Sequence, residues 1–422
     1  MVGAGLSGLA AAHTLARRGA RVVVLERGEF PGTKNLMGGV LYARPMEEVF
    51  PGWEEEAPLE RPIVRQEYWL LSPQGGFRLG LHPQRWVSRP NAYTVLRARF
   101  DAWLASRVER AGAVVVPETL VVDLLREGER VVGVRTDRPE GDLRARMVII
   151  AEGVNRFLVQ KAGLGGEFRP REVALGVKQV ISLPQEVIEE RFGVRDREGV
   201  AVEMIGQPTE GMVGAAFLYT NLESVSLGLG VLVHQMVERK RNPLELLEEL
   251  KGHPAVAPFI EGGEVREYGA RLIPEPGPRS IPRLYGEGCL VVGDAAMLSN
   301  AVYREGSNFA LISGKLAAET AWEALEKGDF SSRTLSSYRE RLESSFILPD
   351  LRKFSRVGEL FESHPEFFRV YPSLLVEALS ELLTVDLLPK VAKRRLVLSR
   401  LRRERSLWRL GRDLFRLGRA LG

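Results

Sequence analysis

The sequence has very little cysteine and histidine. Among 422 residues, Cys289 is the single cysteine, and the five histidines are scattered without the spacing of a metal site. One cysteine excludes an internal disulfide, a CxxC redox pair and an iron–sulfur cluster held by this chain alone. The apolar run after Cys289 indicates a small core residue rather than a redox group. We therefore expect neither a metal site nor thiol chemistry.

Long apolar runs are also missing. No run reaches the roughly 18–20 apolar residues that cross a bilayer, and no signal peptide precedes the glycine-rich start. These absences predict a cytoplasmic protein without a transmembrane helix. The apolar fraction of 45% and the charged fraction of 27% are those of a globular protein. The length exceeds one ordinary core and indicates two interleaved domains followed by a tail.

The net charge of +4 conceals an uneven distribution. Residues 390–422 contain twelve Lys or Arg against two acids, so this segment carries +10 and the rest of the chain −6. Within 407–421, leucines recur every three or four residues beside Trp408 and Phe415, and arginines line the other side. Such a basic amphipathic helix is typical of an anionic membrane surface; docking to an acidic protein and plain packing are the alternatives. Nucleic acid is not expected, because no recognition motif accompanies the charge.

A glycine-rich motif opens the chain. Gly3, Gly5 and Gly8 fit G-x-G-x-x-G, and Ser7 precedes the last glycine. An Ala-rich helix over 9–18 and a Val-rich strand over 21–25 follow, and the strand ends at Glu26. This order predicts the second half of a dinucleotide-binding βαβ unit. Its helix N-terminus faces a pyrophosphate, and the acid accepts ribose hydroxyls.

The strand that should precede this motif is reduced to Met1 and Val2. Strands usually run about 5–6 residues, and this one would be central in the sheet. We expect a start codon assigned late, or a truncation.

Later segments resemble motifs of the glutathione-reductase-like flavoproteins. Segment 93–104 is similar to V-x-R-x-x-F-D-x-x-L, which implies a helix that presents Arg97 to the ribityl and pyrophosphate groups. Short β-runs over 114–136 suggest the β-meander of this class, in which Val121 offers its backbone amide to adenine. Segment 147–155 resembles A-D/E-G-x-x-S, with Asn155 in place of the commoner serine. Its acid–glycine turn consists of Glu152 and Gly153.

The most specific of these segments is a buried strand that begins at Cys289 and ends in Gly293 and Asp294. In this class the aspartate accepts the ribityl hydroxyls. A second helix then starts near Gly306 and runs to about residue 325. Its N-terminus, with Ser307 and Asn308, would stabilise negative charge on the flavin pyrimidine. The order of all these motifs indicates FAD. No second G-x-G-x-x-G with its strand and acid follows, so a dedicated NAD(P) domain is not expected.

Five further segments resemble the FixC branch of the electron-transfer-flavoprotein:quinone oxidoreductases, and the likeness runs to about residue 360. They are residues 34–42, 203–206, 217–221, 253–258 and 301–308. The resemblance implies that an electron-transfer flavoprotein of the FixA/FixB type reduces the FAD and that a membrane quinone accepts the electrons. It also implies a small ferredoxin-like iron–sulfur subunit and a peripheral position on the inner face of the cell membrane. In such complexes the partner flavoprotein splits electrons between quinone and a low-potential acceptor.

Two other functions compete with this one. A geranylgeranyl-reductase-like FAD enzyme would reduce prenyl double bonds, but such enzymes resemble Tyr-x-Trp-x-Phe-Pro where this chain has Gly-Ala-Ala-Phe-Leu-Tyr over 214–219. A non-catalytic scaffold subunit is the second alternative, because the first strand is so short.

The expected fold is α/β, with a Rossmann-like FAD-binding domain of the glutathione-reductase/hydroxylase type over 1–169 and 284–345. An interleaved antiparallel β-sheet domain on the quinone side spans 170–283, and a helical region with the basic amphipathic tail spans 346–422. No catalytic side chain and no metal ligand is expected, because the flavin carries the chemistry. The predicted cofactor-binding residues are Gly3, Gly5, Ser7, Gly8, Glu26, Arg27, Lys34, Arg97, Val121, Glu152, Gly153, Gly293, Asp294, Gly306, Ser307 and Asn308.

Overall fold

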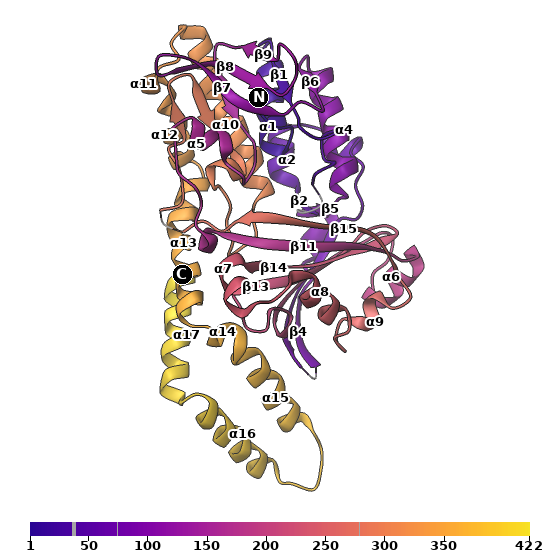
Figure 1. The fold of residues 1–422 in the computed structure, drawn as a ribbon. Coiled ribbons are helices and arrows are strands. Elements are labelled where there is room, and N and C mark those ends of the chain that lie inside the picture. The colour runs from indigo at the N-terminus through magenta and orange to yellow at the C-terminus, as the bar shows by residue number, and fades with distance from the viewer. Residues whose placement is uncertain (36–38, 74, 278) are drawn as a thin grey trace. The chain divides into compact units, whose positions relative to one another are not determined.

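The computed structural model describes residues 1–35, 39–73, 75–277 and 279–422. Contacts divide these residues into two compact units, and Figure 1 labels their elements. The first unit, here the nucleotide unit, comprises Met1–Pro62, Pro90–Val173 and Leu272–Ser355. The second, here the sheet unit, comprises Ile63–Arg89, Ala174–Arg271 and Arg356–Gly422. The α/β fold of the FAD type is confirmed.

The nucleotide unit is built on short strands that helices cover. Its strands are β1 (Val23–Leu25), β2 (Val40–Tyr42), β5 (Ala92–Thr94), β6 (Val114–Val116), β7 (Val121–Glu127), β8 (Arg130–Thr136), β9 (Asp142–Arg144), β10 (Val148–Ile150), β16 (Tyr285–Gly286) and β17 (Cys289–Val291). Its helices are α1 (Leu6–Ala16), α2 (Ala43–Val49), α4 (Arg97–Arg110), α5 (Phe157–Lys161), α10 (Ser307–Lys327), α11 (Ser332–Leu335), α12 (Ser337–Ser344) and most of α13 (Ile347–Ser363). The predicted meander is present as the sheet β7-β8-β9, but residues 114–116, which were expected to belong to it, form β6 and pair with β1 instead.

A single residue, Val2, joins the two strand pairs of this unit's central sheet. Strand β1 pairs in parallel with β6, and β10 pairs in parallel with β17. Val2 bridges the two pairs, in parallel with both Leu25 and Ile150. The amide of Gly3 donates to the Leu25 carbonyl at 2.8 Å, and the amide of Ala151 donates to the Val2 carbonyl at 2.9 Å. The stretch before the glycine motif therefore lies at the centre of the sheet, as its place in the βαβ unit predicts.

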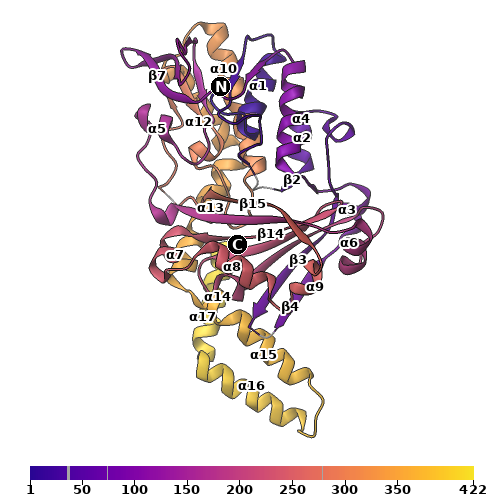
Figure 2. The same ribbon diagram turned by 45° about the vertical axis from the view of Figure 1, so that its right-hand side comes forward.

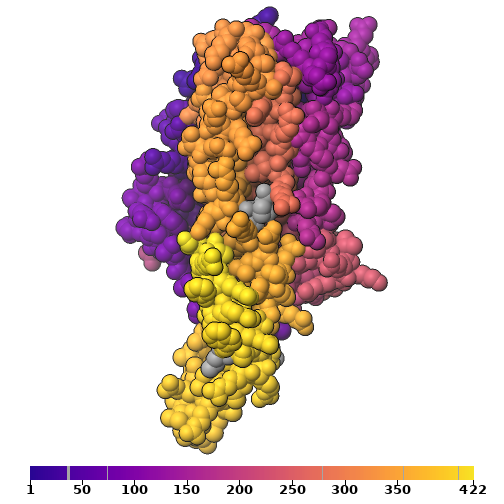
Figure 3. Space-filling model, turned by 90° about the vertical axis from the view of Figure 1, so that its left-hand side faces the viewer, coloured from indigo at the N-terminus to yellow at the C-terminus, as the bar shows by residue number. Residues whose placement is uncertain are grey.

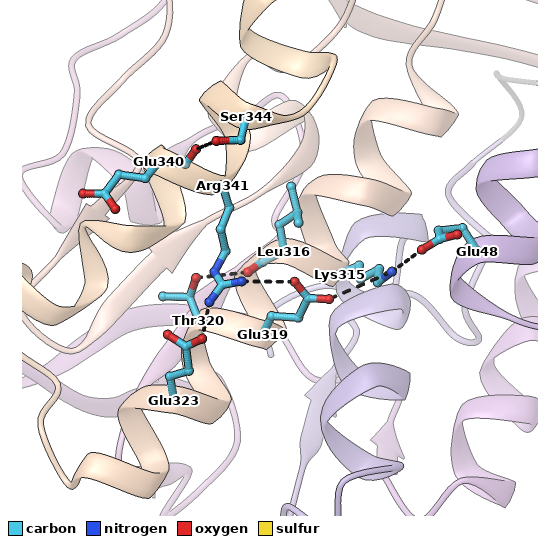
Figure 4. Close-up of polar contacts among 9 residues, drawn as sticks. All are labelled: Glu48, Lys315, Leu316, Glu319, Thr320, Glu323, Glu340, Arg341 and Ser344. Atoms are coloured by element: carbon cyan, nitrogen blue, oxygen red, sulfur yellow. Dashed lines mark hydrogen bonds and ion pairs between the residues drawn. The ribbon is translucent and has the colours of Figure 1, made fainter.

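Helix α10 is held on both sides by charged side chains (Figure 4). Lys315 pairs with Glu48 of α2. Arg341 of α12 pairs with Glu319, at 3.5 Å, and with Glu323. Each pair is partly exposed and contributes little alone, but together they fix α10 between its neighbours. The buried face of α10 is rich in alanine, which allows close helix packing.

The sheet unit contains seven strands in the order β15-β11-β14-β13-β12-β3-β4. They are β3 (Ile63–Ser72), β4 (Gly75–Leu81), β11 (Val173–Ser182), β12 (Gly199–Gly206), β13 (Gly214–Thr220), β14 (Ser224–Leu232) and β15 (Glu264–Pro274). The pairs β11–β14, β12–β13 and β13–β14 are antiparallel, whereas β12 and β3 are parallel. The sheet expected over 170–283 is present as β11, β12, β13, β14 and β15, but it is mixed rather than purely antiparallel, because β3 pairs in parallel with β12.

Two segments join this unit although the sequence pattern places them elsewhere. Strands β3 and β4 extend the sheet, and residues 356–422 belong to the same contact group. The domain boundaries expected from sequence therefore differ from those of the nucleotide unit and the sheet unit. The reason is that pairing of β3 with β12 joins residues more than a hundred positions apart, for example Glu67 with Val202. Local periodicity carries no record of such a partner.

Helices complete the sheet unit (Figure 2). They are α3 (Gln84–Ser88), α6 (Gln185–Phe192), α7 (Val233–Arg239), α8 (Pro243–Lys251), α9 (Ala257–Ile260), α14 (Glu366–Arg369), α15 (Tyr371–Leu383), α16 (Lys390–Glu404) and α17 (Leu407–Leu421). Side chains of α6, α8 and α9 share one apolar core with the sheet, including Ile188, Leu247 and Leu229. None of the helices in the described ranges has the length and apolarity that crossing a bilayer requires.

Candidate functional site

The glycine motif forms a tight loop between the start of the sheet and α1. Gly3 has a φ of +99°, and a Cβ there would lie 2.4 Å from the Ala151 carbonyl oxygen. A Cβ at Gly8 would lie 2.0 Å from the Gly3 carbonyl oxygen. Gly5 differs, since no described atom lies within 4 Å of a Cβ built there. The loop is closed where protein packs on protein and open at Gly5, which leaves room for a pyrophosphate.

Ser7 brings two distant motifs to this loop. A Cβ at Gly293, whose φ is +58°, would lie 2.6 Å from the Ser7 hydroxyl oxygen. A Cβ at Gly314 would lie 2.2 Å from the Ser7 carbonyl oxygen. Gly293 opens the 3₁₀ turn after β17, and Gly314 lies inside α10. The glycine motif at the start of the chain and the Gly293–Asp294 segment thus meet at Ser7. Gly314 was not predicted from the sequence; a glycine inside a helix, which costs helix stability, was the available signal.

Glu26 is oriented by backbone amides at the end of β1. Ala4 donates to one carboxylate oxygen at 2.9 Å, and Gly28 donates to the other at 2.8 Å. Each oxygen keeps a lone pair for a further donor. The Glu26 carbonyl accepts from the Thr119 amide at 2.8 Å. This bond places the start of β7, and therefore Val121, close to Glu26.

The segment with the acid–glycine turn, Glu152 and Gly153, packs against the same glycine loop. The Glu152 carboxylate, however, bonds to a helix of this unit. Gly153 has a φ of +78°, and Ala151 packs against Gly3. The carboxylate of Glu152 accepts the amides of Leu158 at 2.8 Å and Val159 at 2.9 Å. Glu152 therefore caps α5. Burial raises the pKa of Glu152 even though these backbone bonds favour its charged form.

Arg97 lies at the start of α4, as predicted, and its guanidinium pairs with a carboxylate of the same helix. It pairs in a bidentate manner with Asp101, through Nε and Nη2 at 2.8 Å each. Asn35 donates to the same carboxylate at 3.2 Å. Gly32, with a φ of +100°, approaches the Arg97 carbonyl so closely that a Cβ would lie 2.7 Å from it. The segment after Glu26 is thereby fixed against α4. Asp101 was not among the predicted site residues.

The N-terminus of α10 also borders the site. No described atom lies within 4 Å of a Cβ built at Gly306, the N-cap, and the Ser307 hydroxyl donates to the Val40 carbonyl at 3.4 Å. Asn308 is buried, and its Oδ1 has no hydrogen-bond partner among the described residues. Burial and the nearby Asp350 raise the pKa of Glu305. A buried amide oxygen without a donor fits a ligand N–H at this helix end.

The remaining predicted residues lie at the margin. Asp294 is half-buried after β17, at the carboxyl end of that strand. Arg27 and Lys34 are exposed. Residues 36–38 of the FixC-like segment 34–42 lie outside the described residues. Cys289 is buried, which agrees with its predicted place in the core. Burial raises the pKa of its thiol to about 11.

The predicted motifs therefore surround one glycine-lined cradle within the nucleotide unit. Its parts fit FAD: an open loop and a helix N-terminus suit phosphates, and Glu26 suits a ribose. At the far end, a second helix N-terminus with an unpaired amide oxygen suits the polar edge of the flavin.

Comparison with known proteins supports FAD as the cofactor of this chain. The family model "FAD dependent oxidoreductase" matches residues 1–156, and the model "ETF-QO/FixC family C-terminal domain" matches residues 357–422. Protein FixC of Bradyrhizobium diazoefficiens is 46% identical over 426 residues, which cover all of this chain and 98% of that one. Protein FixC of Escherichia coli K12 is 40% identical over 92% of this chain and 90% of its own length.

Among solved structures, a geranylgeranyl bacteriochlorophyll reductase-like protein of Thermoplasma acidophilum superposes with a TM-score of 0.72 at 19% identity, covering 96% of this chain and 98% of its own. That likeness shows the fold alone. Identity of this extent to the FixC proteins shows more, because it runs from end to end. Together with the cradle, it shows that this chain belongs to the FixC family of FAD-dependent oxidoreductases.

Proposed function

We propose that this chain accepts electrons at FAD from an electron-transfer flavoprotein of the FixA/FixB type and passes them to a membrane quinone. It would act as the FixC-type subunit of a complex that splits electrons between quinone and a low-potential acceptor. The observation that carries the proposal is the end-to-end likeness to FixC proteins, including the family's C-terminal domain over 357–422. When bound, FAD supplies the one- and two-electron chemistry that joins such partners.

The nucleotide unit offers residues for each part of the cofactor. The pyrophosphate would lie at Gly5 and the N-terminus of α1, where the backbone leaves space. Glu26, held by two amides, would accept the adenosine ribose hydroxyls. Asp294 would accept ribityl hydroxyls at the end of β17. The N-terminus of α10, with Asn308, would face the flavin pyrimidine and favour its reduction by stabilising negative charge.

The structure suggests indirect roles for two predicted residues. Glu152 already accepts two amides of α5, and Arg97 already holds Asp101. We propose that both act by keeping the backbone of the cradle in place.

Two features of the chain bear on its partners: its single cysteine and its basic C-terminal helix α17. Cys289 is the single cysteine, so an iron–sulfur cluster in the same pathway would require another subunit, such as a small ferredoxin-like protein. The basic helix α17 exposes Trp408 and Phe415, and this combination suits the anionic inner face of the cell membrane. We propose both as parts of the working complex.

The test is an anaerobic titration of the purified protein followed by its visible spectrum. Reduced electron-transfer flavoprotein is added first and a soluble quinone second. We expect a bound flavin band that bleaches and then returns when quinone arrives. Gly5→Ala serves as the control, because it should fold yet hold little FAD. A flavin that is reduced but indifferent to quinone, or a wild-type protein without flavin, would overturn the proposal.

A further inference from the structure

The connection between α15 and α16 exposes an unusual number of apolar side chains. Leu387 is 103% exposed, Val385 88%, Leu383 75%, Val391 61% and Leu388 50%. We call these five residues the apolar tip. A single exposed leucine is ordinary, but a contiguous group marks a surface that contacts something other than water.

The tip is ordered by a lysine that is itself buried. Lys393, with 0% of its side chain exposed, donates to the Thr384 carbonyl at 2.8 Å and pairs with Asp386 at 2.7 Å. Lys390 donates to the carbonyls of Leu382 at 2.7 Å and Thr384 at 2.9 Å. Burial of a lysine side chain is costly unless its charge is paired. The usual arrangement is therefore inverted, with a cation inside and leucines outside.

Several polar groups of the connection are hydrogen-bonded within the protein. The Leu388 amide donates to Asp386, and the hydrogen bond from Lys393 lowers the pKa of that carboxyl, so it stays charged and neutralises the lysine. Backbone carbonyls that bond to protein rather than to water can leave water at lower cost. The carbonyls of Leu382 and Thr384 and the amide of Leu388 would therefore keep their partners if the tip entered an apolar environment.

The surroundings of the tip are basic. Along α16, five exposed arginines follow it, namely Arg394, Arg395, Arg400, Arg402 and Arg403. Exposed Leu396 and Leu398 lie between them. In Figures 1 and 2, α15 and α16 lie side by side and the connection closes one end of the pair. An apolar end with arginines behind it is complementary to an anionic bilayer, whose headgroups lie outside its acyl chains.

We propose that the apolar tip inserts into the interfacial layer of an anionic lipid bilayer and forms a second membrane contact beside α17. The inference rests on the peripheral attachment proposed above and assigns part of it to a separate element. The basic arginines of α16 meet the headgroups, and the tip reaches the upper acyl region.

The experiment uses the full-length protein with its FAD and vesicles of phosphatidylcholine, with or without phosphatidylglycerol. The triple variant Val385→Ser/Leu387→Ser/Leu388→Ser should bind anionic vesicles about tenfold or more weakly, since three exposed apolar groups lose their burial. The matched control Leu79→Ser/Leu81→Ser/Val237→Ser changes three apolar residues of the same unit that are 60%, 53% and 70% exposed, and should bind as the wild type does.

A second readout reports insertion directly. In Leu387→Cys, the new thiol can carry an environment-sensitive fluorophore, because the native Cys289 is buried. We expect a blue shift of its emission on anionic vesicles. No shift while the protein binds, or equal binding of the tip and control variants, would overturn the inference. A change in oligomeric state in light scattering, without a change in vesicle binding, would also overturn it and assign the tip to a second copy.

The failure of this inference can be told apart from failure of the proposed function. Reduction of a water-soluble quinone in vesicle-free solution should be the same for the wild type and the tip variant. Loss of vesicle binding only in Trp408→Ser/Phe415→Ser would leave attachment to α17 alone and refute the role of the tip.

Discussion

The glycine-lined cradle and the C-terminal helices distribute polar and apolar groups in opposite ways. In the cradle, Gly3 and Gly8 leave no room for a Cβ, and the apolar side chains around them are buried. In the C-terminal helices, Lys393 and Asp413 are buried while Trp408 and Phe415 are 77% and 70% exposed. Figure 3 shows that no other segment covers α17 on the face turned to the viewer. The apolar groups of the first region are covered by its own chain, whereas the second retains apolar surface for a partner or a lipid.

The largest expected effect sharpens the account of the cradle. Gly8→Ala places a Cβ 2.0 Å from the Gly3 carbonyl oxygen, so backbone must move. We expect the free energy of unfolding to fall by about 3 kcal/mol or more and the FAD content to drop with it. Chemical denaturation and the ratio of flavin to protein absorbance measure the two effects.

Gly5→Ala is the matched change at the open position. No described atom lies within 4 Å of the new Cβ, so the apoprotein should keep its stability within roughly 0.5 kcal/mol while its FAD affinity falls. If Gly5→Ala destabilised the apoprotein as much as Gly8→Ala, the distinction between the packed and open sides of the loop would fail.

The next effect concerns the attachment of α17. Asp413 accepts from the Tyr371 hydroxyl at 2.6 Å and from Arg405 at 2.6 Å. Burial opposes charge on Asp413, but these hydrogen bonds outweigh it and lower its pKa. Asp413→Ala leaves Arg405 without this partner, and we expect the docking of α17 to weaken by about 3 kcal/mol. Hydrogen exchange should rise across 406–422.

FAD content should remain unchanged in the same variant, because Asp413 lies in the sheet unit. Arg412→Ala, an exposed change one residue earlier, is the control and should leave exchange in α17 as it is. Equal exchange in the two variants would contradict a structural role for Asp413.

A smaller effect depends on pH. His13 lies in α1 against Phe50, with ring centroids 4.5 Å apart, and neither ring nitrogen has a hydrogen-bond partner among the described residues. Burial, helped by Arg17 and Arg107, lowers its pKa to about 4 from the model-peptide value of 6.5. Between pH 6.5 and pH 4, His13 binds a proton in the unfolded chain but stays neutral in the folded chain. Stability should therefore fall between pH 6.5 and pH 4, by at most about 3 kcal/mol.

His13→Leu should remove this part of the pH dependence while leaving stability at pH 8 within about 1 kcal/mol. Urea unfolding at several pH values measures it. An unchanged slope between pH 6.5 and pH 4 in the variant would show that other groups cause the acid sensitivity.

The smallest expected effect concerns Cys289, whose thiol should not react in the folded protein. Burial raises the pKa of Cys289 to about 11, and its side chain is almost fully covered in β17. We expect a thiol reagent to label the native protein only at the rate of unfolding and to label the urea-unfolded chain at once. Fast labelling of the native protein would show that the core of the nucleotide unit opens.

Sequence alone predicted much of the cradle, because its geometry depends on residues with special backbone needs. The glycines, Glu26 and the strand ending at Asp294 lie in motifs whose spacing is local. It missed the capping role of Glu152 and the pairing of Arg97 with Asp101, since both depend on where a side chain turns. It also missed the buried Lys393, whose partners are visible only once α15 and α16 are adjacent. Long-range pairings such as β3 with β12 leave no local signal.

The parallel pairing of β10 with β17 has a consequence for synthesis of the chain. Ile150 pairs with Val291, and residues 151–288 between them include five strands of the sheet unit. During translation the nucleotide-binding sheet cannot close until those strands have left the ribosome, although its glycine loop is made first. The seven strands of the sheet unit are all synthesised before β17, so they have the opportunity to pair before the sheet around the glycine loop closes. Flavin capture is thus expected to be a late event in biogenesis, after release or near it.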